Sequence, residues 1–526
     1  MVLEISSAPF SFSRTHLSIL SRLPTLAAKT IPMRFTKGLY FFLFLVACYF
    51  LLFLHLDSQA LHLWDESRRA VSAFEMVQNG NWLVPMFEGQ PDMYGTKPAL
   101  LVALQAFFMT FLGYNELAVR LPSVLAALAT VFMLIHFAKQ WLRLPFAGYL
   151  GSLVLLTSLM YINYHGAVSG DYDALLCLWT TAYALSYYKY LESFDKKYIY
   201  YTGLFVALAC LTKSIAGLFF APGLIVYTLF RRQFQEVIRK ADLYYAATGS
   251  IALILSYYFL REIYHPGYLH AVWMNEIYGR YFAPQEGHTH DVWYYLRHTY
   301  ESKGFHPWVF FLPFAFIIGY FNEKTKAITQ LILINALVFL WILSNGGTKL
   351  EWYPLPIIPS LSFLIGIALA WLWEHMRSLV SLPYQPILAG LFILAIFAQP
   401  YGKIVQRHLN NTPRGWDGWR ERYRDAMEAF SDEKTYTVLH SRYNGHVVFY
   451  KKIWNHQGHN IRQHILHPPA PHVQATGFST GRLNFPKGQK LLMCEGEAFD
   501  RIRETYEYEE VRWYGKCQMW EIIGPK

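Results

Sequence analysis

Long apolar runs separated by short polar segments dominate the chain from residue 38 to residue 399. The runs are about 15–20 residues long, close to the length that an α-helix needs to cross the hydrocarbon core of a bilayer. They predict helices at residues 38–56, 120–139, 147–165, 172–191, 199–212, 214–230, 243–260, 306–321, 326–344, 353–373 and 384–399. A further run at 98–113 is apolar but short. We therefore expect a polytopic α-helical membrane protein with about 11–13 transmembrane helices.

The pattern changes in residues 400–526, which predict a small soluble α/β domain. Residues 416–430 have the spacing of an amphipathic helix. Residues 435–440 and 446–451 are typical of two strands, joined by a hairpin-type turn at Asn444-Gly445. Further strands are expected at 490–494, 510–513 and 518–523, with a helix at 497–506.

Composition supports this division. Only 16% of the 526 residues are charged and 54% are hydrophobic, whereas a soluble domain carries about 25% charged residues. The net charge of +10 does not indicate nucleic-acid binding, because Lys and Arg gather in short loops between the apolar runs. Residues 1–37 are basic and rich in Ser, so we expect a disordered cytosolic leader; Met33 is an alternative start. Cys494 and Cys517 could pair if the tail faces an oxidising space.

The distribution of Lys and Arg orients the chain. If the run at 98–113 spans the membrane, the basic loop 231–240 faces outward; if it lies at the interface, that loop is cytosolic. Only the second choice satisfies the positive-inside rule in every loop. The outer face then carries loops 57–119, 165–171, 261–305 and 345–352, followed by the tail. The domains are thus a leader (1–37), a transmembrane domain (38–399) and a periplasmic α/β domain (400–526).

Acidic residues open two of these outer loops. Asp65 lies just past the first apolar run, and ionisable groups that approach the hydrocarbon are usually functional. Asp171 and Asp173 come directly before the apolar residues 174–191, on the same side as Asp65. Either could simply cap a helix. Acidic loops that face one cavity could also position an acceptor or a metal.

Cations on the same side suit an anionic ligand. Lys97, Lys213 and Lys349 all fall on the outer face, and Arg280 of the long loop could bind phosphate. Lys213 alone could equally snorkel to the interface. Such a set fits a polyprenyl monophosphate sugar: cations would stabilise the departing phosphate while a carboxylate orients or deprotonates the attacking group.

A metal is the one cofactor that the sequence raises. His288-Thr-His290 resembles a metal-ligand tract, although His-x-His alone is a weak pattern. Glu66 of the first outer loop is a further candidate ligand. We therefore expect either a divalent ion or no cofactor.

An ordered set of motifs resembles one known family. The set comprises Asp65-Glu-Ser-Arg68, Asn79-Gly-Asn-Trp82, Tyr94-Gly-Thr-Lys97-Pro98, Asn115-Glu116 with Arg120, Asp171-Tyr-Asp173, Leu211-Thr-Lys213, His306-Pro307-Trp308, and Thr348-Lys349 with Tyr353-Pro354. Over residues 40–400 it is similar to bacterial glycosyltransferases of the C superfamily, in the group of protein O-mannosyltransferases and lipid A aminoarabinose transferases.

The resemblance implies a multi-pass enzyme of the bacterial inner membrane whose active site faces the periplasm. It implies inverting transfer of a sugar from a polyprenyl-phosphate donor to lipid A, a protein or a glycan. Asp65 would be the catalytic carboxylate, with Asp173 or Asp171 as the second acid. Residues that would bind substrate are Arg68, Tyr94, Lys97, Lys213, Arg280, Lys349 and Tyr353.

This chain departs from the family at two positions. Thr96 stands where the family has Glu before the lysine, and Arg69 stands where it often has Tyr. The main alternative function is a flippase or transporter of lipid-linked sugars, which would need polar residues along the membrane interior. An inactive assembly factor is a third reading, which the intact acidic and basic residues disfavour. A monomer is the default expectation.

Overall fold

The computed structural model describes residues 33–282, 287–301, 304–410, 422–442, 445–467, 479–480 and 483–526. The chain divides into two compact units between Ala47 and Cys48, and every contact discussed below lies within the second. The predicted leader falls largely outside the described residues.

Helices occupy all eleven predicted apolar runs. The long helices are α4 (Glu116–Phe137), α7 (Asp173–Ser193), α8 (Lys196–Lys213), α11 (Ala241–Tyr264), α15 (Lys326–Asn345), α16 (Ile358–Ser378) and α17 (Gln385–Leu409). The others are α1 (Met33–Leu52), α5 (Pro145–Leu156), α9 (Ala221–Phe230) and α14 (Leu312–Phe321). Among the described residues, six helices are long and apolar enough to cross a membrane. On α11, large apolar side chains such as Phe259 and Ile263 are exposed, as a lipid-facing surface requires. The chain is a polytopic helical membrane protein.

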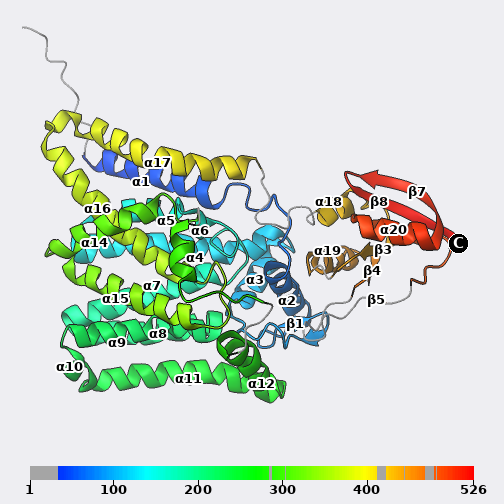
Figure 1. Ribbon diagram of the computed structural model, residues 1–526, viewed down its shortest axis with the longest axis horizontal. Coiled ribbons are helices and arrows are strands. Elements are labelled where there is room, and N and C mark those ends of the chain that lie inside the picture. The colour runs from blue at the N-terminus through cyan, green and yellow to red at the C-terminus, as the bar shows by residue number, and fades with distance from the viewer. Residues whose placement is uncertain are drawn as a thin grey trace, which may run out of the picture. The chain divides into compact units, whose positions relative to one another are not determined.

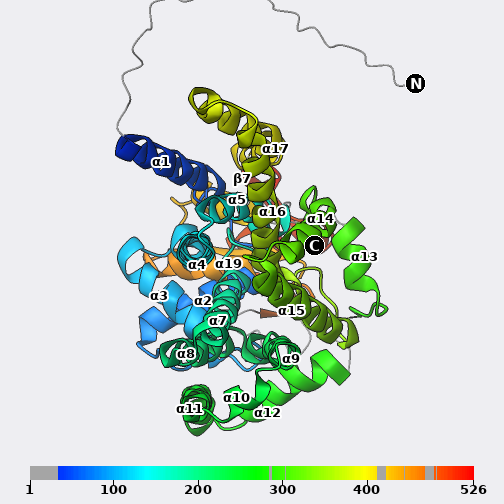
Figure 2. The same ribbon diagram turned by 90° about the vertical axis from the view of Figure 1, so that its left-hand side faces the viewer.

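Within the second unit the long helices from α4 to α15 run side by side, and the segments between them gather at the two ends (Figure 1). One end carries α10 (Phe234–Ile238) with its basic neighbours; the opposite end carries α2 (Asp65–Asn79) and α12 (Tyr268–Val272). Figure 2 views the bundle nearly along the axes of α4, α7, α8 and α11. The run at 98–113 forms α3 (Leu100–Leu112), which at 13 residues is shorter than the roughly 20 that a span needs.

Shorter elements complete the bundle ends. They are β1 (Met86–Phe87), β2 (Gln90–Pro91), α6 (Leu159–Ile162), α13 (Tyr294–Glu301) and the irregular helical turns η1 (Ala138–Leu142), η2 (Ser214–Leu218), η3 (Trp273–Phe282), η4 (Trp308–Phe311), η5 (Leu355–Ile357) and η6 (Leu382–Tyr384).

The tail forms an α/β domain around one six-stranded sheet of order β5-β4-β3-β6-β8-β7. Its elements are α18 (Arg422–Ala429), β3 (Thr435–His440), α19 (Gly445–His456), β4 (Asn460–Ile465), β5 (Ser479–Thr480), β6 (Lys490–Met493), α20 (Gly496–Thr505), β7 (Tyr506–Tyr514) and β8 (Cys517–Pro525). The strands β3, β4, β5 and β6 are parallel, and β8 pairs antiparallel with both β6 and β7. A disulfide joins Cys494 to Cys517.

One expected strand of the tail is wrong. Residues 446–451 lie in the helix α19, not in the second strand of a hairpin. Because β3 and β4 are parallel, the chain must cross over between them, and a helix is the usual crossover. The consecutive apolar residues Val447, Val448 and Phe449 are all buried, so this stretch shows no clear helical period in the sequence. Asn444 of the expected turn lies outside the described residues.

Candidate active site

The four outer loops, although distant in sequence, meet at one end of the bundle and enclose two adjoining cavities. The larger, of about 820 Å³, is lined by polar and aromatic side chains. The narrower, of about 100 Å³, has the apolar wall Leu176, Ile215, Phe219, Phe339 and Leu343. Both are lined by Asp65, Arg69, Lys97, Glu276 and Arg280. These charged residues therefore form a common floor between an apolar space and a polar one.

Asp65 is the first residue of α2. The chain enters the helix through Trp64, whose φ of 64° is unusual for a residue with a side chain and is held by the hydrogen bond from Arg68 N to Trp64 O. This turn leaves Asp65 46% exposed, whereas the following residues of the first two turns are buried. Since Asp65 lines both cavities, its exposure is to the interior of the site.

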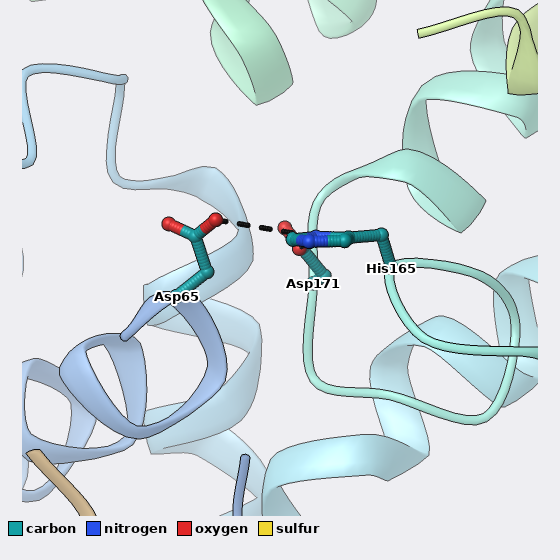
Figure 3. Close-up of side chains that lie close together, drawn as sticks. All are labelled: Asp65, His165 and Asp171. Carbon is teal, nitrogen blue, oxygen red and sulfur yellow. Dashed lines mark hydrogen bonds and ion pairs between the residues drawn. The ribbon is translucent and has the colours of Figure 1, made fainter. Parts of the chain in front are cut away.

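Asp65 faces His165 and Asp171, which the loop between α6 and α7 supplies (Figure 3). His165 Nδ1 lies 4.0 Å from Asp65 Oδ2 and donates a hydrogen bond to Asp171 Oδ2. The ring of Trp352 stacks on His165 with centroids 3.7 Å apart. Arg69 Nη2 contacts Asp65 Oδ1 at 3.1 Å and Asp171 Oδ1 at 3.2 Å. Two carboxylates are thus held together by one guanidinium and one imidazole.

These contacts keep both carboxylates ionised. Burial would raise the pKa of Asp65, but Arg69 and His165 outweigh it and hold the pKa below its usual range. The same opposition between burial and Arg69 lowers the pKa of Asp171. An ionised Asp65 can accept a proton or orient an attacking hydroxyl group.

The two aspartates of the second acidic motif have different surroundings. Asp173 starts α7 and receives two hydrogen bonds from Lys213 Nζ, at 2.6 and 2.7 Å. That pair lines only the narrower cavity, together with Tyr353, whose ring lies 5.8 Å from Lys213 Nζ. The structure therefore puts Asp171 beside Asp65, and Asp173 beside a cation.

Lys97 and Arg280 are two cations of the common floor, and both contact Glu276. Lys97 Nζ lies 3.1 Å from Glu276 Oε1, which also accepts a hydrogen bond from Thr96 Oγ1 at 3.0 Å. Arg280 contacts Glu276 Oε2 at 3.7 Å and donates to the hydroxyl of Tyr353. Burial would raise the pKa of Glu276, but Lys97 and Arg280 hold it at about 2.

Other expected substrate-binding residues take supporting positions. Arg68 donates to both oxygens of Asp92 at 3.0 and 2.7 Å, with the ring of Tyr94 4.9 Å from its guanidinium. This buried pair fixes the fold of the first loop. Lys349 lines the larger cavity and donates to Gly346 O at 2.7 Å.

The residues named as metal ligands do not come together. The Glu66 carboxylate accepts hydrogen bonds from Arg120, at 2.8 and 3.1 Å, and from the backbone of His62 and Gly170. His290 stacks on Tyr294 in an exposed segment, and His288 lies on the rim of the larger cavity.

Among the described residues, one group has ligand atoms within 4.8 Å of one another: Asp65, His165 and Asp171. Arg69 Nη2 contacts one oxygen of each aspartate, and His165 Nδ1 is hydrogen-bonded to the other oxygen of Asp171. Asp65 Oδ2 and His165 Nε2 are not engaged in this way. Arg69 therefore already occupies, with a positive charge, the place between the two carboxylates where a divalent ion would bridge them.

Sequence reasoning missed three members of the site. His165 stands in Tyr164-His-Gly166, which matches no motif, so only the fold reveals it. Arg69 was visible as a departure from the family pattern and Glu276 only as one charge among several in loop 261–305, but their partners lie 102 and 180 residues away.

The fold and the site define a polytopic membrane protein with a charged, two-cavity centre at one end of its bundle. Residues 96–258 match the family described as dolichyl-phosphate-mannose-protein mannosyltransferase. Over that stretch, the match confirms the resemblance to the glycosyltransferase group that the motifs indicated.

Individual relatives agree. The undecaprenyl phosphate-alpha-4-amino-4-deoxy-L-arabinose arabinosyl transferase of Aeromonas salmonicida is 29% identical over 324 residues, 60% of this chain and 58% of that protein. The corresponding protein of Erwinia tasmaniensis is 25% identical over 387 residues, 71% of this chain and 67% of that protein. The chain thus matches only about 58% of the length of the first of these relatives.

Solved structures share the fold. ArnT from Cupriavidus metallidurans bound to undecaprenyl phosphate has a TM-score of 0.69 at 16% identity, over 93% of this chain and 99% of that one. An Archaeoglobus fulgidus oligosaccharyltransferase has a TM-score of 0.52 at 12% identity, over 81% of this chain and 64% of the other.

Proposed function

We propose that this protein is an inverting glycosyltransferase that moves a sugar from a polyprenyl-phosphate donor to an acceptor. The names of its relatives make an undecaprenyl-phosphate-linked aminoarabinose the first donor to test. Lipid A is the first acceptor, ahead of a protein or a glycan. The observation that carries the proposal is the common floor, where an ionised carboxylate and several cations lie between an apolar and a polar cavity.

In the proposed reaction the donor lipid enters the narrower cavity and its phosphate meets Lys97, Arg280 and Tyr353. The acceptor enters the larger cavity and reaches Asp65. The acceptor oxygen attacks the anomeric carbon from the side opposite the phosphate while Asp65 orients it or takes its proton. The new glycosidic bond forms as the bond to the phosphate oxygen breaks. The cations stabilise the charge that returns to the phosphate.

The proposed orientation puts this site in the periplasm. The basic loops lie at the other end of the bundle, as the positive-inside rule requires of a cytosolic end. The Cys494–Cys517 disulfide favours an oxidising compartment for the tail. The proposed span count is eleven, with α1, α5, α7, α9 and α14 added to the six long apolar helices, and with α3 at the interface.

Asp65→Asn tests the function. In a deletion strain that carries this variant, we expect the sugar modification of lipid A to disappear from its mass spectrum, because general-base assistance contributes about 10²–10⁴-fold. Wild type and the exposed control Asp500→Asn should both restore it.

Full modification by Asp65→Asn would contradict the proposal. If the deletion leaves lipid A unchanged and alters periplasmic glycoproteins or glycans instead, the acceptor is a protein or a glycan. Lipid-linked sugar accumulating on the cytosolic side would favour a flippase.

A further inference from the structure

Arg69 lies between Asp65 of the common floor and Asp171, which lines the narrower cavity. It lies one helical turn after Asp65 on α2, and its side chain is 9% exposed. A single nitrogen, Nη2, contacts Asp65 Oδ1 at 3.1 Å and Asp171 Oδ1 at 3.2 Å. The guanidinium lies 4.1 Å from the centre of the Tyr172 ring, which fixes its plane.

This geometry meets a definite electrostatic need. Two carboxylates that share a buried site repel each other, and without a cation one of them would take up a proton. A cation that bridges one oxygen of each keeps both ionised. It also leaves Asp65 Oδ2 directed toward His165 and the cavity.

Arg69 also retains donors for a ligand. Its Nε and Nη1 are buried, and among the described residues the Tyr172 side chain is the one further group that interacts with this guanidinium, yet Arg69 lines both cavities. A buried guanidinium with unused N–H groups is costly unless an oxygen-rich ligand completes it.

We propose that Arg69 is a built-in cation that bridges Asp65 and Asp171 in place of a divalent metal, so that transfer by this protein needs no added metal. The statement that transfer needs no added metal rests on the proposed function, whereas the bridging role of Arg69 does not. It makes Arg69 a positioning residue for Asp65. Removing the guanidinium should turn the pair of carboxylates into a metal site.

Metal binding tests the bridge without any assay of activity. The purified full-length protein is titrated with Mn²⁺ and followed by electron paramagnetic resonance. Wild type, Arg69→Lys and the distant control Arg231→Ala should bind no Mn²⁺ at this site. Arg69→Ala should bind one ion, and the added change Asp65→Asn should abolish that binding. Mn²⁺ binding by wild type that Asp65→Asn removes would overturn the proposal, as would no binding by a folded Arg69→Ala.

Chemical rescue tests the same bridge in the reaction, with an undecaprenyl-phosphate aminoarabinose donor and lipid A. Wild-type turnover should change less than twofold in EDTA. Arg69→Ala should lose about 100-fold, the scale of losing hydrogen bonds to charged groups, and should recover at least tenfold with millimolar guanidinium or Mn²⁺. If Arg69→Ala does not fold, Arg69→Gln, which keeps the bulk and loses the charge, takes its place in both experiments.

The outcomes separate two failures. Wild-type transfer that EDTA abolishes and metal restores would overturn the bridge while leaving the glycosyltransferase intact. No transfer by wild type would count against the proposed function alone, because the Mn²⁺ titration still decides the role of Arg69.

Discussion

At the scale of single residues, the carboxylate beside Lys97 comes from a different segment of the chain than the family pattern predicts. Thr96 lacks the carboxylate that the family has beside its lysine. Glu276 brings a carboxylate to that lysine from a loop 180 residues away, and Thr96 Oγ1 donates to it. The charge next to Lys97 is therefore preserved.

Glu276→Gln should lower kcat/KM about 10–100-fold, because Lys97 loses a hydrogen-bonded charge partner worth about 1.5–3 kcal/mol and Arg280 loses its ion-pair partner. The double variant Thr96→Glu/Glu276→Gln should recover part of that loss, because it places a carboxylate beside Lys97 again, at residue 96 instead of residue 276. Steady-state kinetics measure these changes in kcat/KM, with the exposed Glu323→Gln as the control. A double variant no better than Glu276→Gln would count against the exchange.

The same carboxylate gives a pH dependence with a definite sign. The pKa of Glu276 is held at about 2 in the folded protein, below its ordinary value of about 4.3. A lowered pKa stabilises the folded state above the unfolded pKa, and that stability is lost as pH falls from about 4.3 toward 2. The difference in melting temperature between wild type and Glu276→Gln should be constant above about pH 5 and shrink below about pH 4. A difference that grows on acidification would contradict this.

Sequence motifs point to Asp65, Lys97 and Asp171, because each motif consists of residues that are adjacent in the chain. They could not identify His165, whose importance depends on the fold bringing its ring between Trp352 and Asp171. They also could not separate the roles of Asp171 and Asp173, which differ only in which cation each one meets.

At the scale of elements, α2 is the part that carries the site, and the soluble domain supports it. Ala70, Phe74 and Met76 of α2 share one buried apolar cluster with Phe449 and Tyr450 of α19. Polar contacts surround this cluster: Tyr450 OH donates to Glu116 at 2.7 Å, and Lys452 pairs with Glu75 at 2.7 Å. The helix that presents Asp65 is thus held from behind by the tail.

Tyr450→Phe should destabilise the protein by about 1–3 kcal/mol, because Leu61 N and Glu116 each lose a buried partner. The melting temperature of the purified protein should fall, and transfer should fall with it as α2 loosens. The half-exposed Tyr514→Phe on the same domain should change neither. A Tyr450→Phe protein that melts like wild type would show that α19 is not a support.

At the scale of the whole molecule, sequence predicts the membrane part better than the tail. A bilayer admits few solutions for an apolar run, and a helix is the one that satisfies its backbone. In the tail, residues 446–451 are buried between the sheet and α2, so burial on all sides erased the periodicity that distinguishes a helix from a strand. The helix at 497–506 and the strands β6 and β8 kept a clear pattern and were correctly predicted.

Removing the disulfide should weaken the tail. It closes a loop with a sequence separation of 23, for which about 2–4 kcal/mol is typical. Cys494→Ser/Cys517→Ser should lower the melting temperature, and a reductant should lower that of wild type alone. Cys48, Cys177 and Cys210 are buried thiols, so the reductant has no other expected target. Equal sensitivity of both proteins to the reductant would contradict this assignment.

The contact between Leu61 and Tyr450 also determines when, during synthesis, α2 can gain its support from the tail. The two residues are 389 positions apart, so at 5–20 residues per second a ribosome needs roughly 20–80 s to make the second after the first. During that interval the Asp65 helix is already at the membrane without its support. A nascent chain would therefore hold an incompletely supported Asp65 helix until synthesis of the tail is finished.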